Sequence, residues 1–232
     1  MSVTTAHGTG TAHGACTPAV RVTRSLLGYG IIAGPSYLAA GVAEALTRGG
    51  FDPLHDDLSL LANGPLGWIH MTLLAVTGLM TIAGAAGLWR ALPPGPGGTW
   101  GPRLVAGYGA GLIAAGLLTA DPMNGFPAGT PAGPPGQLSW HGMGHLASGA
   151  AGFACLVAAC FVLARRFRAG GRPGWSAYSR ITGVVFLAGF AAIASGPGSP
   201  AVVLAFWLAV AAAWMWVSAV SLAAYRQAAP LT

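Results

Sequence analysis

The sequence predicts an all-α fold, a polytopic membrane bundle of six transmembrane helices with both termini in the cytoplasm. The first observation is composition, because 54% of the 232 residues are hydrophobic and only 7% are charged. That is too little charge to cover the surface of a soluble domain. The second observation is a series of six apolar stretches, and the third is the placement of arginine at their ends.

The six stretches are bounded by Arg, Pro or Gly and approach the roughly 20 residues that a helix needs to cross a bilayer. We place the spans at residues 25–46, 66–89, 103–120, 140–164, 180–196 and 201–224. The fifth is short and ends in "SGPGSP", so the last two segments could form a re-entrant hairpin. The sixth is long enough to span alone, which favours six spans within a transmembrane domain of residues 23–226.

The segments outside this domain are expected to be cytoplasmic tails. Residues 1–22 are rich in Thr, Gly and Ala and have neither a basic leader nor an apolar run, so they are no signal peptide and are expected to be disordered. A short tail, 227–232, follows the last span. Cys16 lies in the first tail, whereas Cys155 and Cys160 lie in the cytoplasmic half of the fourth span, so we expect no structural disulfide.

The orientation follows from the arginines, because cationic loops are retained in the cytoplasm. If the six spans cross the membrane in alternating directions, ten of the eleven arginines fall on one side of the membrane and only Arg48 falls on the other. That other side collects every acid of the chain, Glu44, Asp52, Asp56, Asp57 and Asp121. The net charge of +6 suits contact with membrane lipids that carry anionic headgroups, and the scattered basic residues indicate no nucleic-acid partner.

Eleven arginines without a lysine, together with abundant Ala and Gly, favour a high-GC bacterial source and therefore the bacterial plasma membrane. Glycines at four-residue spacing, as in "GYGIIAG", "GYGAGLIAAG" and "GFAAIASG", give small-residue faces on which helices can approach closely. We therefore expect a tightly packed bundle.

The stretch "SWHGMGH", residues 139–145, places two histidines on one stripe at the outer end of the fourth span. His141 and His145 are close enough in this spacing to reach one ion. His70 and Asp121 are expected at the same membrane level. Three imidazoles and a carboxylate would complete a tetrahedral zinc site, or three ligands would leave the fourth position to water.

Zinc at this site would generate a hydroxide nucleophile near neutral pH. Asp121 would then act as ligand or base, and Asp56 or Asp57 as a free general base. Ser139 would orient the substrate or the metal-bound water. These residues are the catalytic candidates of the sequence.

Structural interpretations stand beside this hypothesis. Two histidines in the first turns of a helix can simply bond loop backbone, and HxxxH is a weaker signal than HExxH. Asp121, followed by proline, is typical of a turn. Glu44 and Arg48 have the spacing of a helical ion pair, and Asp57 has the place of a cap on a short interfacial helix.

The outer connection "DPMNGFPAGTPAGPPGQLSW" is irregular because of its many prolines and glycines. Phe126 and Met123 give it apolar surface to bury. It would either fold over the site as a lid or serve as a flexible linker.

Several of these motifs carry a resemblance to a known family. The chain from Arg24 to Tyr225, and in particular its "GFDPL", "LS", "DP..GFP.GTP" and "HG..H" elements, resembles the bacterial membrane-protein family called domain of unknown function 998. The resemblance implies a multi-helix integral membrane fold. It implies no activity, so no catalytic residue is carried over.

A looser likeness is to the membrane hydrolase superfamily that includes alkaline ceramidases, in which three histidines, an aspartate and a serine gather zinc between helices. This chain has the matching residue types in His70, His141, His145, Asp121 and Ser139. It has one expected span fewer, and the order of its motifs differs, so the likeness is an analogy.

Two classes of function follow. The first is a metal-assisted hydrolase that acts on lipid or amide bonds at the outer leaflet. The second is a non-enzymatic membrane protein that binds a lipid, an ion or a partner subunit through its polar outer face. The absence of an acid or base at mid-span disfavours transport.

Overall fold

The computed structural model describes residues 17–95, 97–196 and 199–228. Within these ranges the fold is all-helical and contains no strand. Most of the expected tail, including Cys16, lies outside the described residues. The elements are α1 (Pro18–Thr47), the 3₁₀ helix η1 (Leu58–Ala62), α2 (Gly67–Ala91), α3 (Trp100–Leu117), α4 (Trp140–Ala169), α5 (Pro173–Ala194) and α6 (Pro200–Gln227).

Two helices, α1 and α5, begin well before the starts that the sequence predicts, residues 25 and 180. Pro18 occupies the first turn of α1 and the Thr17 hydroxyl accepts a hydrogen bond from Val20 N, so the helix starts inside the segment assigned to the tail. Pro173 opens α5 in the same way. Proline suits this position because the first helical N–H groups have no partner within the helix.

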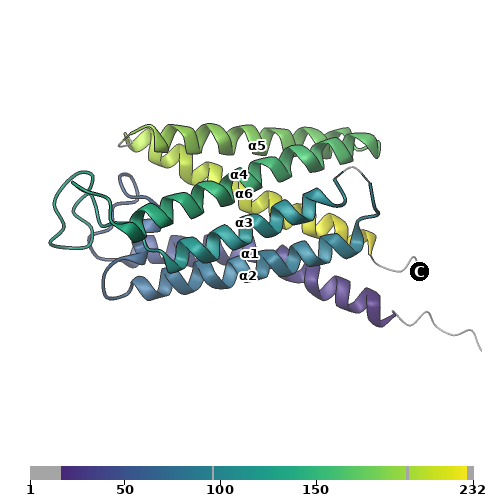
Figure 1. Ribbon diagram of the computed structural model, residues 1–232, viewed down its shortest axis with the longest axis horizontal. Coiled ribbons are helices and arrows are strands. Elements are labelled where there is room, and N and C mark those ends of the chain that lie inside the picture. Colours follow the sequence, from purple (N-terminus) through teal and green to yellow (C-terminus); the bar gives the residue numbers. More distant parts are fainter. Residues whose placement is uncertain (1–16, 96, 197–198, 229–232) are drawn as a thin grey trace, which may run out of the picture.

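The helices form a ring in which each packs against the next in the chain and α6 packs back against α1 (Figure 1). The connections 48–66 and 118–139 lie at one end of the ring, together with all five acids, and this is called the acidic end. The start of α1 and the end of α6 lie at the other end with ten arginines, and this is called the basic end. The predicted separation of charge is therefore present in the fold.

Five helices of the described chain, α1, α2, α4, α5 and α6, are long and apolar enough to cross a membrane. The remaining helix, α3, has 18 residues and carries Arg103 in its first turn. It nevertheless packs along both α2 and α4.

Small residues set the closest contacts between neighbouring helices, as the glycine spacing predicts. A methyl group on Gly109 would lie 2.7 Å from the carbonyl oxygen of Gly78, and one on Gly111 would lie 2.6 Å from the Cα of Gly152. The backbones of α2, α3 and α4 therefore approach closely at these points, where larger side chains would force them apart.

Aromatic side chains fill the middle of the ring. Trp214 is fully buried, stacks on Tyr37 at 4.9 Å between ring centroids, and lies 5.5 Å from Tyr108. Cys155 and Cys160 are both free and belong to or pack against this core, in agreement with the sequence. Tyr37, Tyr108 and Trp214 form the aromatic core of the bundle.

Candidate functional site

The two histidines of "HGMGH" hold the end of α3. The Nδ1 atom of His145 donates to the carbonyl oxygens of Ala115 and Leu118 at 2.9 and 2.8 Å. The Nδ1 atom of His141 donates to the carbonyl oxygen of Thr119 at 3.0 Å. The last carbonyl groups of a helix have no partner within it, so these imidazoles satisfy acceptors that would otherwise stay unpaired.

Asp121 and Ser139 complete the same junction. One Asp121 oxygen accepts from the Ser139 hydroxyl at 2.5 Å and the other from the Ser139 backbone N–H at 2.8 Å. The Ser139 hydroxyl in turn caps α4 by accepting from Gly142 N at 3.0 Å. The hydroxyl hydrogen bond, followed by the backbone one and the nearby His141, holds the Asp121 pKa below its usual value. We call this set, Ala115, Leu118, Thr119, Asp121, Ser139, His141, Gly142 and His145, the α3–α4 latch.

Gly142 is required by the latch. A Cβ atom at this position would collide with the Asp121 carboxylate. The glycine therefore lets the end of the α3 connection reach the first turn of α4.

The structure does not gather the four residues predicted to bind zinc into one group. Asp121 uses both oxygens on Ser139, His141 lies 3.8 Å from Asp121 Oδ1, and His70 is bonded elsewhere. In the described part of the chain, no group of three or more His, Cys, Asp or Glu side chains is placed to hold a metal. Zinc binding stays a prediction.

His70 is fully buried and donates from Nδ1 to Glu44 at 2.9 Å. The predicted ion pair between Glu44 and Arg48 is confirmed, also at 2.9 Å. Arg48 reaches further, to the carbonyl oxygens of Asn63 and Leu66. Glu44 therefore links α1 to α2, and its charge is compensated by Arg48 on one side and by His70 on the other. Because Nδ1 carries the donated proton, neutral His70 presents Nε2 as an acceptor.

The two neighbouring aspartates of the first connection have different environments. Asp56 accepts from the Asp52 backbone N–H at 2.8 Å and holds that turn, and it does not line the cavity described below. Asp57 stands at the N-cap position of η1, but its side chain makes no capping hydrogen bond, so the capping interpretation is wrong. Its carboxyl group lines the central cavity instead.

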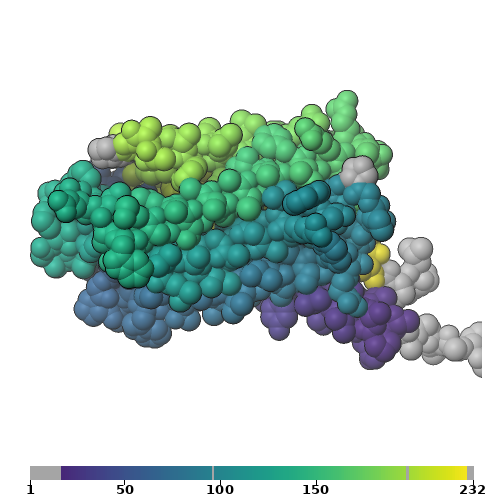
Figure 2. Space-filling model, viewed as in Figure 1, coloured from purple at the N-terminus to yellow at the C-terminus, as the bar shows by residue number. Residues whose placement is uncertain are grey.

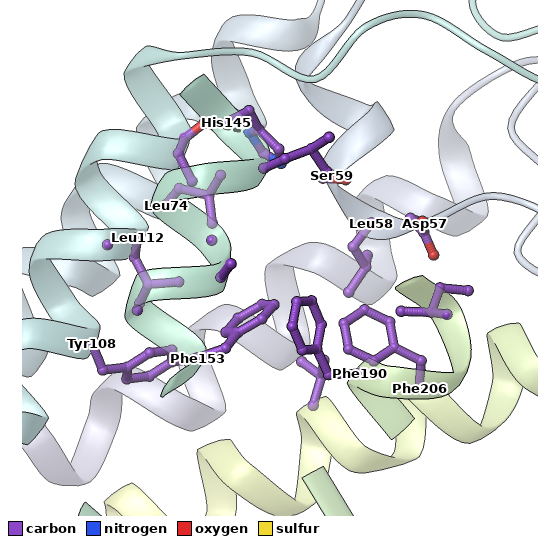
Figure 3. A pocket seen from close by; sticks show the side chains of 18 of the residues that line it. Asp57, Leu58, Ser59, Leu74, Tyr108, Leu112, His145, Phe153, Phe190 and Phe206 are labelled. Atoms are coloured by element: carbon purple, nitrogen blue, oxygen red, sulfur yellow. Dashed lines mark hydrogen bonds between the residues drawn. The ribbon is translucent and has the colours of Figure 1, made fainter. Parts of the chain in front are cut away.

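A cavity of about 420 Å³ lies inside the ring and is lined by all six helices and η1. Polar side chains line it near the acidic end, namely Asp57, Ser59, His70, His145 and Trp207. Tyr108, Phe153, Phe190, Phe206 and Trp214 line its deeper part with several aliphatic residues. Figure 3 shows His145 and Ser59 at the top of the pocket, Asp57 on the right beside Leu58, and the labelled aromatic rings below.

The long outer connection packs over η1. Phe126 is 2% exposed and meets Phe51 edge to face at 5.4 Å, while Leu60 and Leu61 of η1 complete this second apolar cluster. The predicted burial of Phe126 is confirmed. The connection covers the element that closes the cavity, rather than lining the cavity itself.

Three buried polar atoms of the cavity lining, Asp57 Oδ1, His70 Nε2 and Trp207 Nε1, have no hydrogen-bond partner among the described residues. Burial, with a smaller effect of the neighbouring Asp56 charge, raises the Asp57 pKa to about 6. Buried polar groups are normally paired, so such a cluster marks a place where a ligand would complete the bonding.

Sequence reasoning did not single out Trp207 or Ser59. The available signal for Trp207 was its place within the last apolar stretch, residues 201–224.

The model of a family described as "Protein of unknown function (DUF998)" matches residues 31–223. The chain belongs to the DUF998 family. The matched region contains the α3–α4 latch and every residue that lines the central cavity of this DUF998 protein. No curated protein and no solved structure matches the chain.

Replacing His145 with alanine is expected to lower the free energy of unfolding by about 1–3 kcal/mol, because two carbonyl groups of α3 lose their partner. Denaturant unfolding in detergent measures this loss. Met143→Ala, an exposed position two residues away, is the matched control and should change little.

Metal analysis of the same samples separates the latch from the zinc hypothesis. The latch alone predicts a loss of stability at an unchanged metal content. About one zinc per chain, lost in the His141→Ala/His145→Ala double variant, would establish the predicted metal site as well.

The raised Asp57 pKa predicts a pH-dependent stability. The folded protein holds this proton more tightly than the unfolded chain, whose value is near 3.8, so ionisation costs stability as pH rises from about 4 to about 6. The stability of Asp57→Asn relative to wild type should therefore increase over that window by on the order of 2–3 kcal/mol.

Unfolding of both proteins between about pH 4 and 7 checks this prediction. Asp52→Asn is the control. Hydrogen bonds from the Leu54 N–H and then from His55 lower the Asp52 pKa below its ordinary value, so Asp52 is largely ionised in both states across this window and the variant should change little relative to wild type. A difference between Asp57→Asn and wild type that stays constant across the window would contradict the assignment.

Proposed function

We propose that this DUF998 protein is a six-span bacterial plasma-membrane protein that binds an amphipathic small molecule, such as a lipid, in its central cavity. The observation that carries the proposal is the cavity itself, an apolar space with polar groups gathered at one end. The acidic end would face the exterior and both termini the cytoplasm.

The distribution of charge supports this topology. Ten arginines at the basic end match the excess of cationic residues that cytoplasmic loops carry. The packing of α3 between α2 and α4 supports a sixth span, since a helix placed between two spans shares their environment. An even number of spans puts both termini on the same side.

The cavity has the size and chemistry of a site for an amphiphile. Ligand sites commonly measure about 300–1,000 Å³ and combine an apolar lining with a few placed polar groups. Along α4 the lining runs from His145 to Phe153, which corresponds to about 12 Å of helix. A polar head would lie near His145, and an apolar chain would extend toward Phe153 and Trp214.

Metal-assisted hydrolysis is the second candidate. His70 and His145 both line the cavity, and each has its Nδ1 atom held by an acceptor. Metal-ligating histidines commonly donate their other ring N–H to a carboxylate or a backbone carbonyl in this way. Binding is favoured because Asp121 and Ser139, the other members of the proposed catalytic set, are engaged with each other in the latch.

Filling part of the cavity should weaken binding. Gly149 lines the cavity and no atom lies within 4 Å of where its Cβ atom would stand, so Gly149→Leu adds bulk to the cavity wall. Binding of dodecanol, measured by calorimetry in a neutral detergent, should weaken at least tenfold. Gly28→Leu, which also points into open space but lies outside the cavity, should bind as wild type does. Equal binding by all three proteins would overturn the proposal.

Cysteine labelling tests the orientation. In a variant without Cys16, Cys155 and Cys160, an impermeant maleimide should label Ala128→Cys on intact cells. Ala169→Cys should react only after permeabilisation. Both positions are exposed and they lie at opposite ends of the bundle. The reverse pattern would contradict the proposed topology.

A further inference from the structure

We infer that the ligand of the central cavity is an amphiphile with a primary ammonium head, which pairs with Asp57 and enters sideways between α4 and α5. This inference rests on the proposed function and names the class of molecule that the cavity would take.

The polar end of the cavity is rich in acceptors. Because Nδ1 of His70 donates to Glu44 and Nδ1 of His145 donates to α3 carbonyls, each neutral imidazole has Nε2 left as an acceptor. Asp57 adds a carboxylate. The donors that line this end are the Trp207 N–H and the Ser59 hydroxyl. A ligand head that donates several hydrogen bonds therefore fits better than one that only accepts them.

The negative charge at the polar end of the cavity favours a ligand with a cationic head. Arg48 is the one arginine at the acidic end, and its guanidinium is occupied by Glu44 and by the carbonyl oxygens of Asn63 and Leu66. Across the described ranges, Asp57 Oδ1 has no hydrogen-bond partner, and the charged neighbour that influences it is another acid, Asp56. A buried carboxylate without a counter-charge is costly, and an ammonium group would supply both the charge and three N–H donors.

An anionic head would have the opposite effect. A carboxylate or phosphate placed beside Asp57 would add repulsion in a region of low dielectric, where charge interactions are strong. A neutral hydroxyl would donate one hydrogen bond and leave the carboxylate charge uncompensated. The expected order of affinity for equal chains is therefore amine, then alcohol, then carboxylate.

The route of entry lies in the wall between α4 and α5. Leu146 lines the cavity and is 55% exposed, and the cavity-lining residues Ala150 and Ala194 are also exposed. Deeper in the bundle the two helices are closed together, since Phe153 meets Phe186 and Phe190 at 4.9 and 5.0 Å. Figure 1 shows α4 and α5 converging toward the basic end and separating toward the acidic end, where Figure 2 shows the surface hollowed.

This opening faces the position that lipid would occupy around a membrane-embedded ring. An amphiphile could therefore pass from the bilayer with its chain between the helices and its head at the level of Asp57. Entry from the aqueous side is obstructed, because η1 closes the acidic end and the connection around Phe126 packs over it.

Three probes with the same twelve-carbon chain test the inference: dodecylamine, dodecanol and dodecanoate. Binding to the full-length protein is measured by calorimetry in a neutral detergent near pH 7.5. Wild type should bind dodecylamine at least tenfold more tightly than dodecanol, and dodecanoate most weakly. Asp57→Asn should lose the preference for the amine, and a cooperative unfolding transition in detergent shows that this variant is folded.

Asp52→Asn is the matched control, because it removes an acid from the same connection without touching the cavity. It should keep the preference, which excludes a general attraction of the amine to the acidic end. Equal affinity of wild type for amine and alcohol, or a preference that survives Asp57→Asn, would overturn the inference. Dodecanol binding that Gly149→Leu weakens would then still support the proposed function, whereas no binding of any probe would defeat both.

Discussion

The polar ends of α3 and α4 must be satisfied close to an apolar environment, and the arrangement of the acidic end depends on this constraint. Backbone groups that are buried without a hydrogen-bond partner are costly. His141 and His145 donate to the end of α3, while Ser139, held by Asp121, caps the start of α4. The end of α3 is therefore held against the start of α4, and the two helices together form one wall of the cavity.

The cavity follows from where large and small side chains are placed. Glycines lie at the seams between neighbouring helices, so the backbones meet closely around the ring. Trp214, Tyr37 and Tyr108 fill the middle. Near the acidic end, α4 and α5 diverge and η1 provides the cover, so space remains that no side chain occupies. An aromatic floor and exposed cavity-lining residues between α4 and α5 suit a site that exchanges a ligand with the membrane.

Features determined by local pattern could be predicted from the sequence. The apolar stretches located the helices, the arginines located the basic end, and the spacing of Glu44 and Arg48 gave their ion pair. Features that depend on which helix lies opposite could not. The i, i+4 spacing places His141 and His145 on one face, but it does not tell whether that face meets carbonyl oxygens or an ion. The direction of the Asp57 side chain was missed for the same reason, since an aspartate before a short helix ordinarily caps it.

The two carboxylates nearest the cavity show how the fold separates structure from recognition. Glu44 is buried with Arg48 on one side and His70 on the other, so its charge is consumed in joining α1 to α2. Asp57 lies at the same end, lines the cavity and, among the residues that the structure describes, has an oxygen without a hydrogen-bond partner. Within the described ranges, the fold places Arg48 beside Glu44 but places no arginine beside Asp57. The uncompensated charge of Asp57 costs stability. That cost is recovered when a cation binds, which makes Asp57 the group through which ligand binding and folding stability are linked.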